Sequence, residues 1–204
     1  MYSELCGGWS RRLTLFVRRN RMSLPIETFA ENVRRFCKWA ESCKHDVETA
    51  RQLLLALMQG TPYLVTPDVQ EEEPEYPERG HEGWQADHKR FSDFPFQYYR
   101  EVFSPCDLDG EELVTGDVHD DLADMYGDLW HGLQALDRGN GVYAVRYWRE
   151  SYFQHWGHHA SAAIYAIDEY YRKIKNGEQD APPNGGPPMP FGNADVVGGP
   201  PSVS

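Results

Sequence analysis

The residues best suited to chemistry in this sequence are two aspartates, Asp121 and Asp124, and two histidines, His155 and His159. Residues three or four positions apart lie on one face of an α-helix, so each pair presents its side chains together. Neutral imidazole nitrogens and carboxylate oxygens are ligands that a divalent transition metal accepts. We therefore take these four residues as candidate metal ligands, with a divalent transition metal as the candidate cofactor, although the sequence establishes no cofactor.

The same residues have a second interpretation that needs no metal. A buried imidazole needs a partner for its ring N–H, and a buried carboxylate needs hydrogen-bond donors. Reciprocal Asp–His hydrogen bonds between two helices satisfy both groups without any chemistry. Both interpretations require the four side chains to face each other, so they depend on the elements that carry them.

The aspartates lie in the clearest predicted helix, which starts at Asp117 and stops at Gly139. Its buried face is apolar, and a stripe of aspartates runs beside that face: Asp117, Asp121, Asp124 and Asp128. The histidines lie in a last helix predicted from about residue 142 to residue 175, with Gly157 as a weak point.

A tight turn, Gly139-Asn140-Gly141, joins these two helices and predicts a hairpin. Residues whose numbers sum to about 280 then lie level with each other, at ~100° of rotation per residue. This places Asp121 opposite His159 and Asp124 near His155. The four side chains are therefore expected to meet at the edge of the core.

Two further helices are predicted near the start of the chain. Pro25 suits the first turn of a helix that continues to about Ala40, and apolar residues recur along it at helical spacing. Asp46 can cap a second helix that ends at Gly60. With the C-terminal hairpin, these elements predict an all-α helical bundle of four to five helices.

Between the two helix pairs the helical pattern stops. Residues 66–90 are rich in Pro, Gly and Glu, and we predict a long acidic loop there. The aromatic residues that follow are typical of a core, with a ligand-binding aromatic box as the other interpretation: Phe91, Phe94, Phe96, Tyr98 and Tyr99.

Composition divides the chain into three parts. Residues 1–22 carry five arginines and one glutamate and are predicted to be a basic flexible extension, with either Met1 or Met22 as the true start. Residues 23–176 form the predicted single helical domain. Residues 177–204 are rich in Pro and Gly and are predicted to be a disordered tail.

The net charge of −12 argues against partners that carry negative charge, both nucleic acid and an anionic membrane surface. The longest apolar run falls well short of the ~20 residues that a bilayer requires. The four cysteines form no Cys-x-x-Cys motif and fit free thiols in a reducing compartment. These features predict an acidic cytoplasmic protein.

Known catalytic patterns fit only in part. A ferritin-like di-iron site needs Glu-x-x-His, but Tyr152 and Trp156 stand three residues before the two histidines. The dipeptide His119-Asp120 is similar to that of His-Asp phosphohydrolases, yet both residues are predicted to point away from the apolar stripe. No phosphate-binding Gly-rich loop or nucleophile elbow is present.

Three stretches resemble a bacterial family, the domain-of-unknown-function family numbered 5063. They are Val102-Phe103-Ser104-Pro105, the run from Asp120 to Leu129, and Phe153-Gln154-His155-Trp156-Gly157-His158-His159. The resemblance spans about residues 26–174 and implies a helical domain. It implies no activity, cofactor or catalytic residue.

Two classes of function follow. The sequence favours a non-enzymatic protein-interaction or accessory protein, because no complete catalytic set appears and exposed acidic loops often bind protein partners. The alternative is a divalent-metal-dependent hydrolase that uses the Asp/His cluster.

Overall fold

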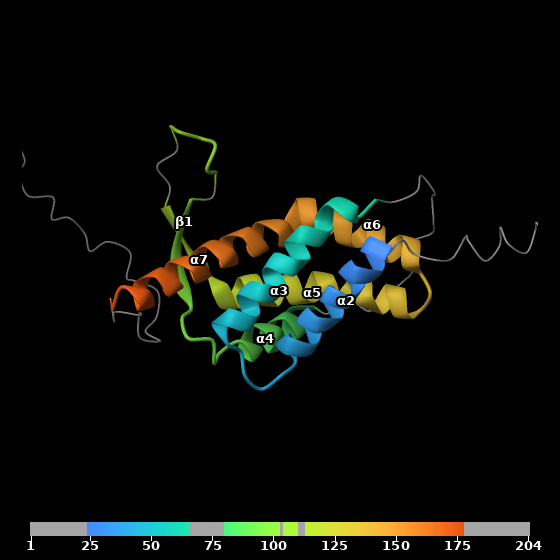
Figure 1. Ribbon diagram of the computed structural model, residues 1–204, viewed down its shortest axis with the longest axis horizontal. Helices are drawn as coiled ribbons and strands as arrows, with labels where there is room; N and C mark the ends of the chain where they lie inside the picture. The colour runs from blue at the N-terminus through green and yellow to red at the C-terminus, as the bar shows by residue number, and fades with distance from the viewer. Residues whose placement is uncertain (1–23, 66–79, 103, 110–112, 178–204) are drawn as a thin grey trace, which may run out of the picture.

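A computed structural model describes residues 24–65, 80–102, 104–109 and 113–177. These residues are mostly helical and share one hydrophobic core. Figure 1 shows the helices packed side by side, with a small hairpin of strands at one end of the long helix α7. The predicted extension 1–22 and all but the first residue of the predicted tail lie outside the described residues.

The two N-terminal helices form as predicted and pack against each other. Helix α2 is Leu24–Ala40, and helix α3 is Val47–Gly60, followed by the 3₁₀ turn Thr61–Tyr63. Asp46 caps α3 by accepting a hydrogen bond from the backbone N–H of Thr49. This satisfies one of the amide groups that a helix start leaves without a partner.

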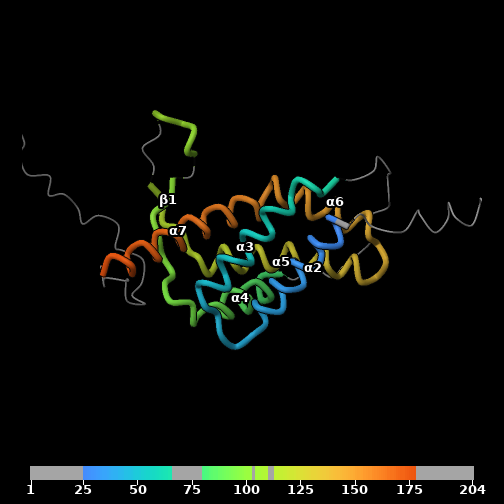
Figure 2. Tube along the Cα trace, in the orientation of Figure 1, coloured from blue at the N-terminus to red at the C-terminus, as the bar shows by residue number. Residues whose placement is uncertain are grey.

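Helix α5, Val118–Asp137, lies at the centre of the bundle and contacts α2, α4, α6 and α7 (Figure 2). Its apolar stripe is buried as predicted, and Asp117 caps its first turn. The neighbouring helices contribute the largest buried side chains, among them Trp148, Trp156 and Phe29. Helices α6 and α7, which follow the turn near Asn140, both contact α5 as the predicted hairpin requires.

The prediction of a long acidic loop over residues 66–90 is wrong for residues 80–90. Residues 80–90 form helix α4, Gly80–Arg90, whereas 66–79 lie outside the described residues. This helix is almost entirely polar, so its sequence lacks the apolar periodicity that predicts a helix. Its contacts with α5 and the buried carboxylate of Asp87, which accepts a hydrogen bond from Arg90 at 3.0 Å, stabilise it.

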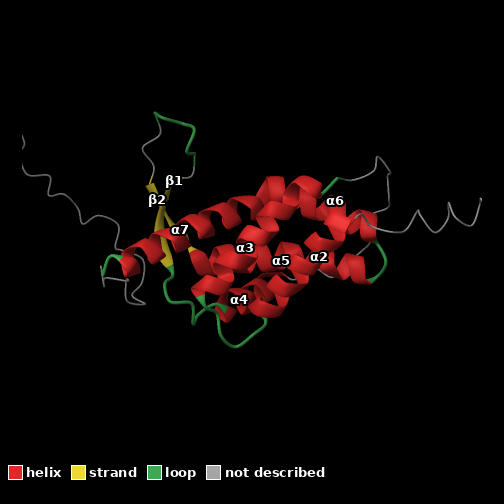
Figure 3. Cartoon of the chain, in the orientation of Figure 1, coloured by secondary structure: helices red, strands yellow, loops and turns green. Residues whose placement is uncertain are grey.

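A two-stranded antiparallel sheet, which the sequence pattern does not predict, precedes α5 (Figure 3). Strand β1, Tyr98–Val102, pairs with β2, Leu113–Asp117, and Tyr99 lies opposite Gly116. The phenylalanines before β1 are buried in the core, as expected: Phe91, Phe94 and Phe96. The fold remains mostly helical, with this hairpin as an addition.

The predicted last helix is interrupted near its middle. It consists of α6, Gly141–Ser151, a π-helical turn, Tyr152–Trp156, and α7, Gly157–Lys175. A side chain at Gly157 would collide with the backbone carbonyl and the ring of Tyr152. The predicted weak point therefore marks the end of the π turn, where only glycine fits. No helix among the described residues has the length and apolar character needed to cross a membrane.

Candidate metal centre

Helices α5 and α7 bring Asp121 and His159 together, as the hairpin geometry predicts. Nδ1 of His159 lies 2.8 Å from Oδ1 of Asp121, and the two side chains are 18% and 7% exposed. The other carboxylate oxygen, Oδ2, accepts a 2.7 Å hydrogen bond from the hydroxyl of Tyr99 on β1. Asp121 is thus held between a strand and a helix.

His155 lies near Asp124 as predicted, but its Nδ1 faces another member of the aspartate stripe, Asp128. Its Nδ1 lies 2.9 Å from Oδ2 of Asp128, one turn beyond Asp124. The hydroxyl of Tyr147 donates to Oδ1 of Asp128 at 3.2 Å. Asp128 was visible in the aspartate stripe, but hairpin counting could not select it over Asp124, because the two carboxylates lie one turn apart on α5 and both face His155.

Both histidines turn their second ring nitrogen toward Asp124. Oδ2 of Asp124 lies 3.4 Å from Nε2 of His159 and 3.7 Å from Nε2 of His155. Its other oxygen, Oδ1, accepts a hydrogen bond from the indole N–H of Trp84 on α4 at 3.1 Å. Asp124, His155 and His159 thus offer three ligand atoms within 4.8 Å of one another.

The hydrogen bonds at Nδ1 determine what the Nε2 atoms can do. A neutral imidazole that donates its Nδ1–H to a carboxylate carries a lone pair at Nε2. Two such lone pairs and a carboxylate oxygen, which also only accepts, then face one another. Three acceptors at this separation repel each other unless protons or a cation lie between them.

The distances fit a metal ion. Zn–N and Zn–O bonds of about 2.0–2.2 Å in a tetrahedral site place neighbouring ligand atoms roughly 3.4 Å apart. The two Nε2–Oδ2 separations, 3.4 and 3.7 Å, are close to that value and longer than good N–H···O hydrogen bonds. Carboxylates on the far ring nitrogens are the usual support for metal-binding histidines.

The electrostatics of this site favour positive charge. The pKa of His155 is raised, mainly by its hydrogen bond to Asp128. Burial opposes the charged form of His159, but the hydrogen bond and charge of Asp121 raise its pKa overall. Burial and the charge of Asp124 raise the pKa of Asp120. A divalent cation would offset this local excess of carboxylates.

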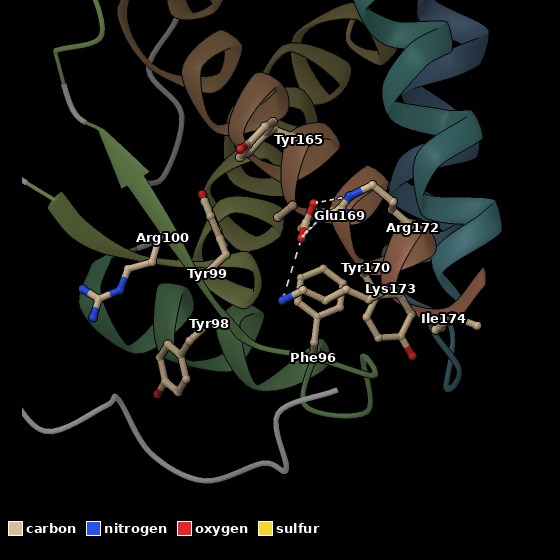
Figure 4. A pocket seen from close by; sticks show the side chains of 11 residues that line it. Phe96, Tyr98, Tyr99, Arg100, Tyr165, Glu169, Tyr170, Arg172, Lys173 and Ile174 are labelled. Atoms are coloured by element: carbon tan, nitrogen blue, oxygen red, sulfur yellow. Dashed lines mark hydrogen bonds and ion pairs between the residues drawn. The ribbon is translucent and has the colours of Figure 1, made fainter. Parts of the chain in front are cut away.

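Tyr99, which donates to Asp121, also lines a surface cavity of about 410 Å³ between β1 and the end of α7 (Figure 4). Its ring passes over Gly116 on the paired strand, where any side chain would collide with it. Burial and the charge of Asp121 raise the pKa of Tyr99, so its hydroxyl remains a donor. The strand pairing, absent from the sequence prediction, therefore positions a contact of Asp121.

The structure corrects the prediction for His119. Its side chain is buried, with 5% exposure, although it was predicted to point away from the apolar stripe. Helix α4 contacts α5 and places the ring of His88 against that of His119, and α4 lacks the apolar periodicity that would have predicted it. By contrast, the side chain of His158 is half exposed and lies 2.8 Å from Oε1 of Glu101.

Comparisons with known proteins place the chain in a family without a described function. The family model described as "Domain of unknown function (DUF5063)" matches residues 21–172, which confirms the resemblance predicted from the sequence. The crystal structure of protein BF1032 from Bacteroides fragilis is similar, with a TM-score of 0.58 at 14% identity. That similarity covers 75% of this chain and 93% of the other, and it concerns the fold alone. No curated protein matches the chain.

Proposed function

This chain belongs to the family described as "Domain of unknown function (DUF5063)", and we propose that the domain binds a divalent transition metal between α5 and the C-terminal helices. The ligands are Nε2 of His155, Nε2 of His159 and Oδ2 of Asp124. The observation that carries the proposal is the convergence of these three acceptor atoms, with each Nδ1 already bonded to a carboxylate.

Asp121 and Asp128 belong to the proposed centre as supports for the histidines, not as ligands. Each orients one imidazole, and a tyrosine hydroxyl holds each carboxylate in turn. This revises the predicted ligand set, in which Asp121 bound the metal directly. It also combines the two interpretations of the sequence, because the Asp–His hydrogen bonds are those that prepare histidines for a metal.

Three protein ligands leave at least one coordination position for water. A bound divalent metal lowers the pKa of that water and supplies a nucleophile near neutral pH. His155 is half exposed, so the centre is reachable from solvent. A metal-dependent hydrolase is therefore the activity class that this centre supports.

The interaction or accessory role favoured by the sequence stays a prediction. It rested on the lack of a complete catalytic set in the sequence and on the acidic segment, of which one part is helix α4 and the other lies outside the described residues. No described surface identifies a partner. The convergent ligand atoms are the more specific observation and shift our preference to the metal centre.

Elemental analysis of protein purified without an affinity tag tests the proposal. We expect at least one equivalent of a divalent metal, or its recovery after incubation with Zn²⁺, Mn²⁺ or Fe²⁺. His155→Gln and His159→Gln should each remove an equivalent. His158→Gln is the matched control, since this neighbouring histidine lies outside the ligand set. Failure of wild-type protein to bind any of the three metals would refute the proposal.

A further inference from the structure

A second group of metal-ligating side chains lies between α4, the end of β2 and the start of α5. His88 comes from α4, Asp117 ends β2, and His119 lies in the first turn of α5. These three residues also place one ligand atom each within 4.8 Å of the others. The group shares no residue with the centre formed by Asp124, His155 and His159.

The carboxylate of this group is held in place by its surroundings. Oδ1 of Asp117 accepts from the backbone N–H groups of His119 and Asp120 at the start of α5. Oδ2 accepts from the side chain of Gln97 at 2.9 Å and faces Nε2 of His88 at 3.3 Å. That separation is again near the roughly 3.4 Å between ligands of a tetrahedral zinc ion.

An independent observation points to a missing ligand. Only 5% of the surface of His119 is exposed. Its Nε2 has no hydrogen-bond partner in the described part of the chain. Buried polar side-chain atoms in proteins almost always have a partner. The ring of His119 lies against that of His88, with centroids 5.8 Å apart.

We propose that His88, Asp117 and His119 form a second metal site, suited to Zn²⁺ and separate from the centre described above. Two imidazoles and a carboxylate form a ligand set that zinc accepts, with water or another ligand in the fourth position. The side chains of His88 and Asp117 are only 28% and 23% exposed, so this site is more enclosed than the first. The ion serves to hold the structure together.

Helix α4 is the element that such an ion would hold. Asp87 is its only fully buried described side chain, so little apolar contact fixes it to the bundle. One turn before His88, Trp84 packs against the His88 ring at 5.4 Å and donates to Asp124 of the first centre. A zinc ion at His88 would therefore also hold Trp84 against that ligand.

The second ion should bind more weakly than the first. The site lies at the N-terminus of α5, where the helix dipole disfavours a cation, and Asp117 offsets this only in part. Titration of the metal-free full chain with Zn²⁺ should therefore fill two sites in sequence, and the tighter one should disappear with His155→Gln.

The test uses the full-length double variant His155→Gln/His159→Gln, which lacks the first centre. We expect it to retain one equivalent of Zn²⁺, and to show slower hydrogen exchange of the α4 amides when Zn²⁺ is bound. Adding His88→Ala should remove both effects. His81→Ala, on the same helix but outside the ligand group, is the control and should remove neither.

His88 is the variant of choice because it is partly exposed, and circular dichroism reports whether each variant keeps its helices. Zinc binding that survives His88→Ala, or a folded double variant that binds none, would overturn the second site. The result is independent of the first centre, because His88→Ala in the otherwise unchanged chain should leave the equivalent that depends on His155 and His159.

Discussion

Two regions of this molecule place histidines against aspartates, and they differ at the second ring nitrogen. His45 is buried before α3, with Nδ1 2.5 Å from Asp93 and Nε2 3.2 Å from the carbonyl oxygen of Ala40. Each nitrogen has its own acceptor at hydrogen-bond distance. In the candidate metal centre, the Nε2 atoms of His155 and His159 instead share one carboxylate oxygen at 3.4 and 3.7 Å.

The comparison shows that an Asp–His hydrogen bond alone does not distinguish a structural histidine from a metal ligand. Both regions have such a bond at Nδ1. At His45 the remaining nitrogen faces a single backbone carbonyl oxygen, that of Ala40, and the ring joins a loop to a helix. At the metal centre the remaining nitrogens converge, and this convergence requires a cation or protons.

The largest expected effect comes from removing one ligand. His159→Ala should abolish the metal equivalent bound by Asp124, His155 and His159, together with the stabilisation that this ion provides. That stabilisation is about 4 kcal/mol when free metal is 1,000 times the Kd. Calorimetric melting with and without chelator measures it. If chelator lowered the Tm of the variant and the wild type equally, the comparison would fail.

Acidification should release the metal in a range set by the histidines. Metal binds the neutral imidazole, and the hydrogen bond to Asp128 raises the pKa of His155, so protons compete at higher pH than for an ordinary histidine. Metal content measured by equilibrium dialysis should fall as pH decreases through these values.

The metal-free protein should respond to pH in the opposite sense. A histidine whose folded-state pKa is raised contributes stability below its unfolded pKa, and this contribution is lost as pH rises through the folded value. Chelator-treated protein should therefore lose stability with rising pH, whereas metal-loaded protein gains it. If the stability of metal-free and of metal-loaded protein changed with pH in the same direction, the assignment of the histidines as metal ligands would be contradicted.

The carboxylates behind the histidines should have a smaller effect. Asp121→Asn and Asp128→Asn should each weaken metal affinity by about 10- to 100-fold, because each loses the acceptor that orients an imidazole. Competition with a metal indicator reports the affinity. Asp137→Asn, near the exposed end of α5, should leave it unchanged.

His45, the structural histidine, should affect the stability of the protein but not its metal content. His45→Ala should lower the free energy of unfolding by about 1–3 kcal/mol, since it leaves the buried carbonyl of Ala40 without its partner. Its metal content should remain that of the wild type. Urea denaturation and elemental analysis of the same sample separate the two effects. Loss of metal in this variant would contradict the distinction between His45 and the candidate metal centre.

The smallest effect concerns the helix cap beside His45. Asp46→Ala should cost about 1 kcal/mol of stability at neutral pH. The backbone hydrogen bond from Thr49 lowers the pKa of Asp46, so its contribution is present above the unfolded pKa and lost as pH falls through the folded value. Variant and wild type should therefore converge in acid, well below the pH that releases the metal.

Local patterns in the sequence determined the main helices and the meeting of Asp121 with His159. Apolar periodicity, the caps at Asp46 and Asp117 and the turn near Asn140 each act over a few residues. They can therefore be recognised in the sequence without a structure. The same rules located Gly157 as a break, although they could not show that the break is a π turn.

Tertiary contacts decided the rest. Helix α4 and the β hairpin are stabilised by their neighbours more than by their own patterns, so neither could be predicted. Asp128 became the partner of His155, and Asp124 the shared acceptor, through side-chain geometry that counting along helices does not resolve. The sequence determined which residue types meet, whereas the directions of their nitrogen and oxygen atoms, on which metal binding depends, follow from packing between distant segments.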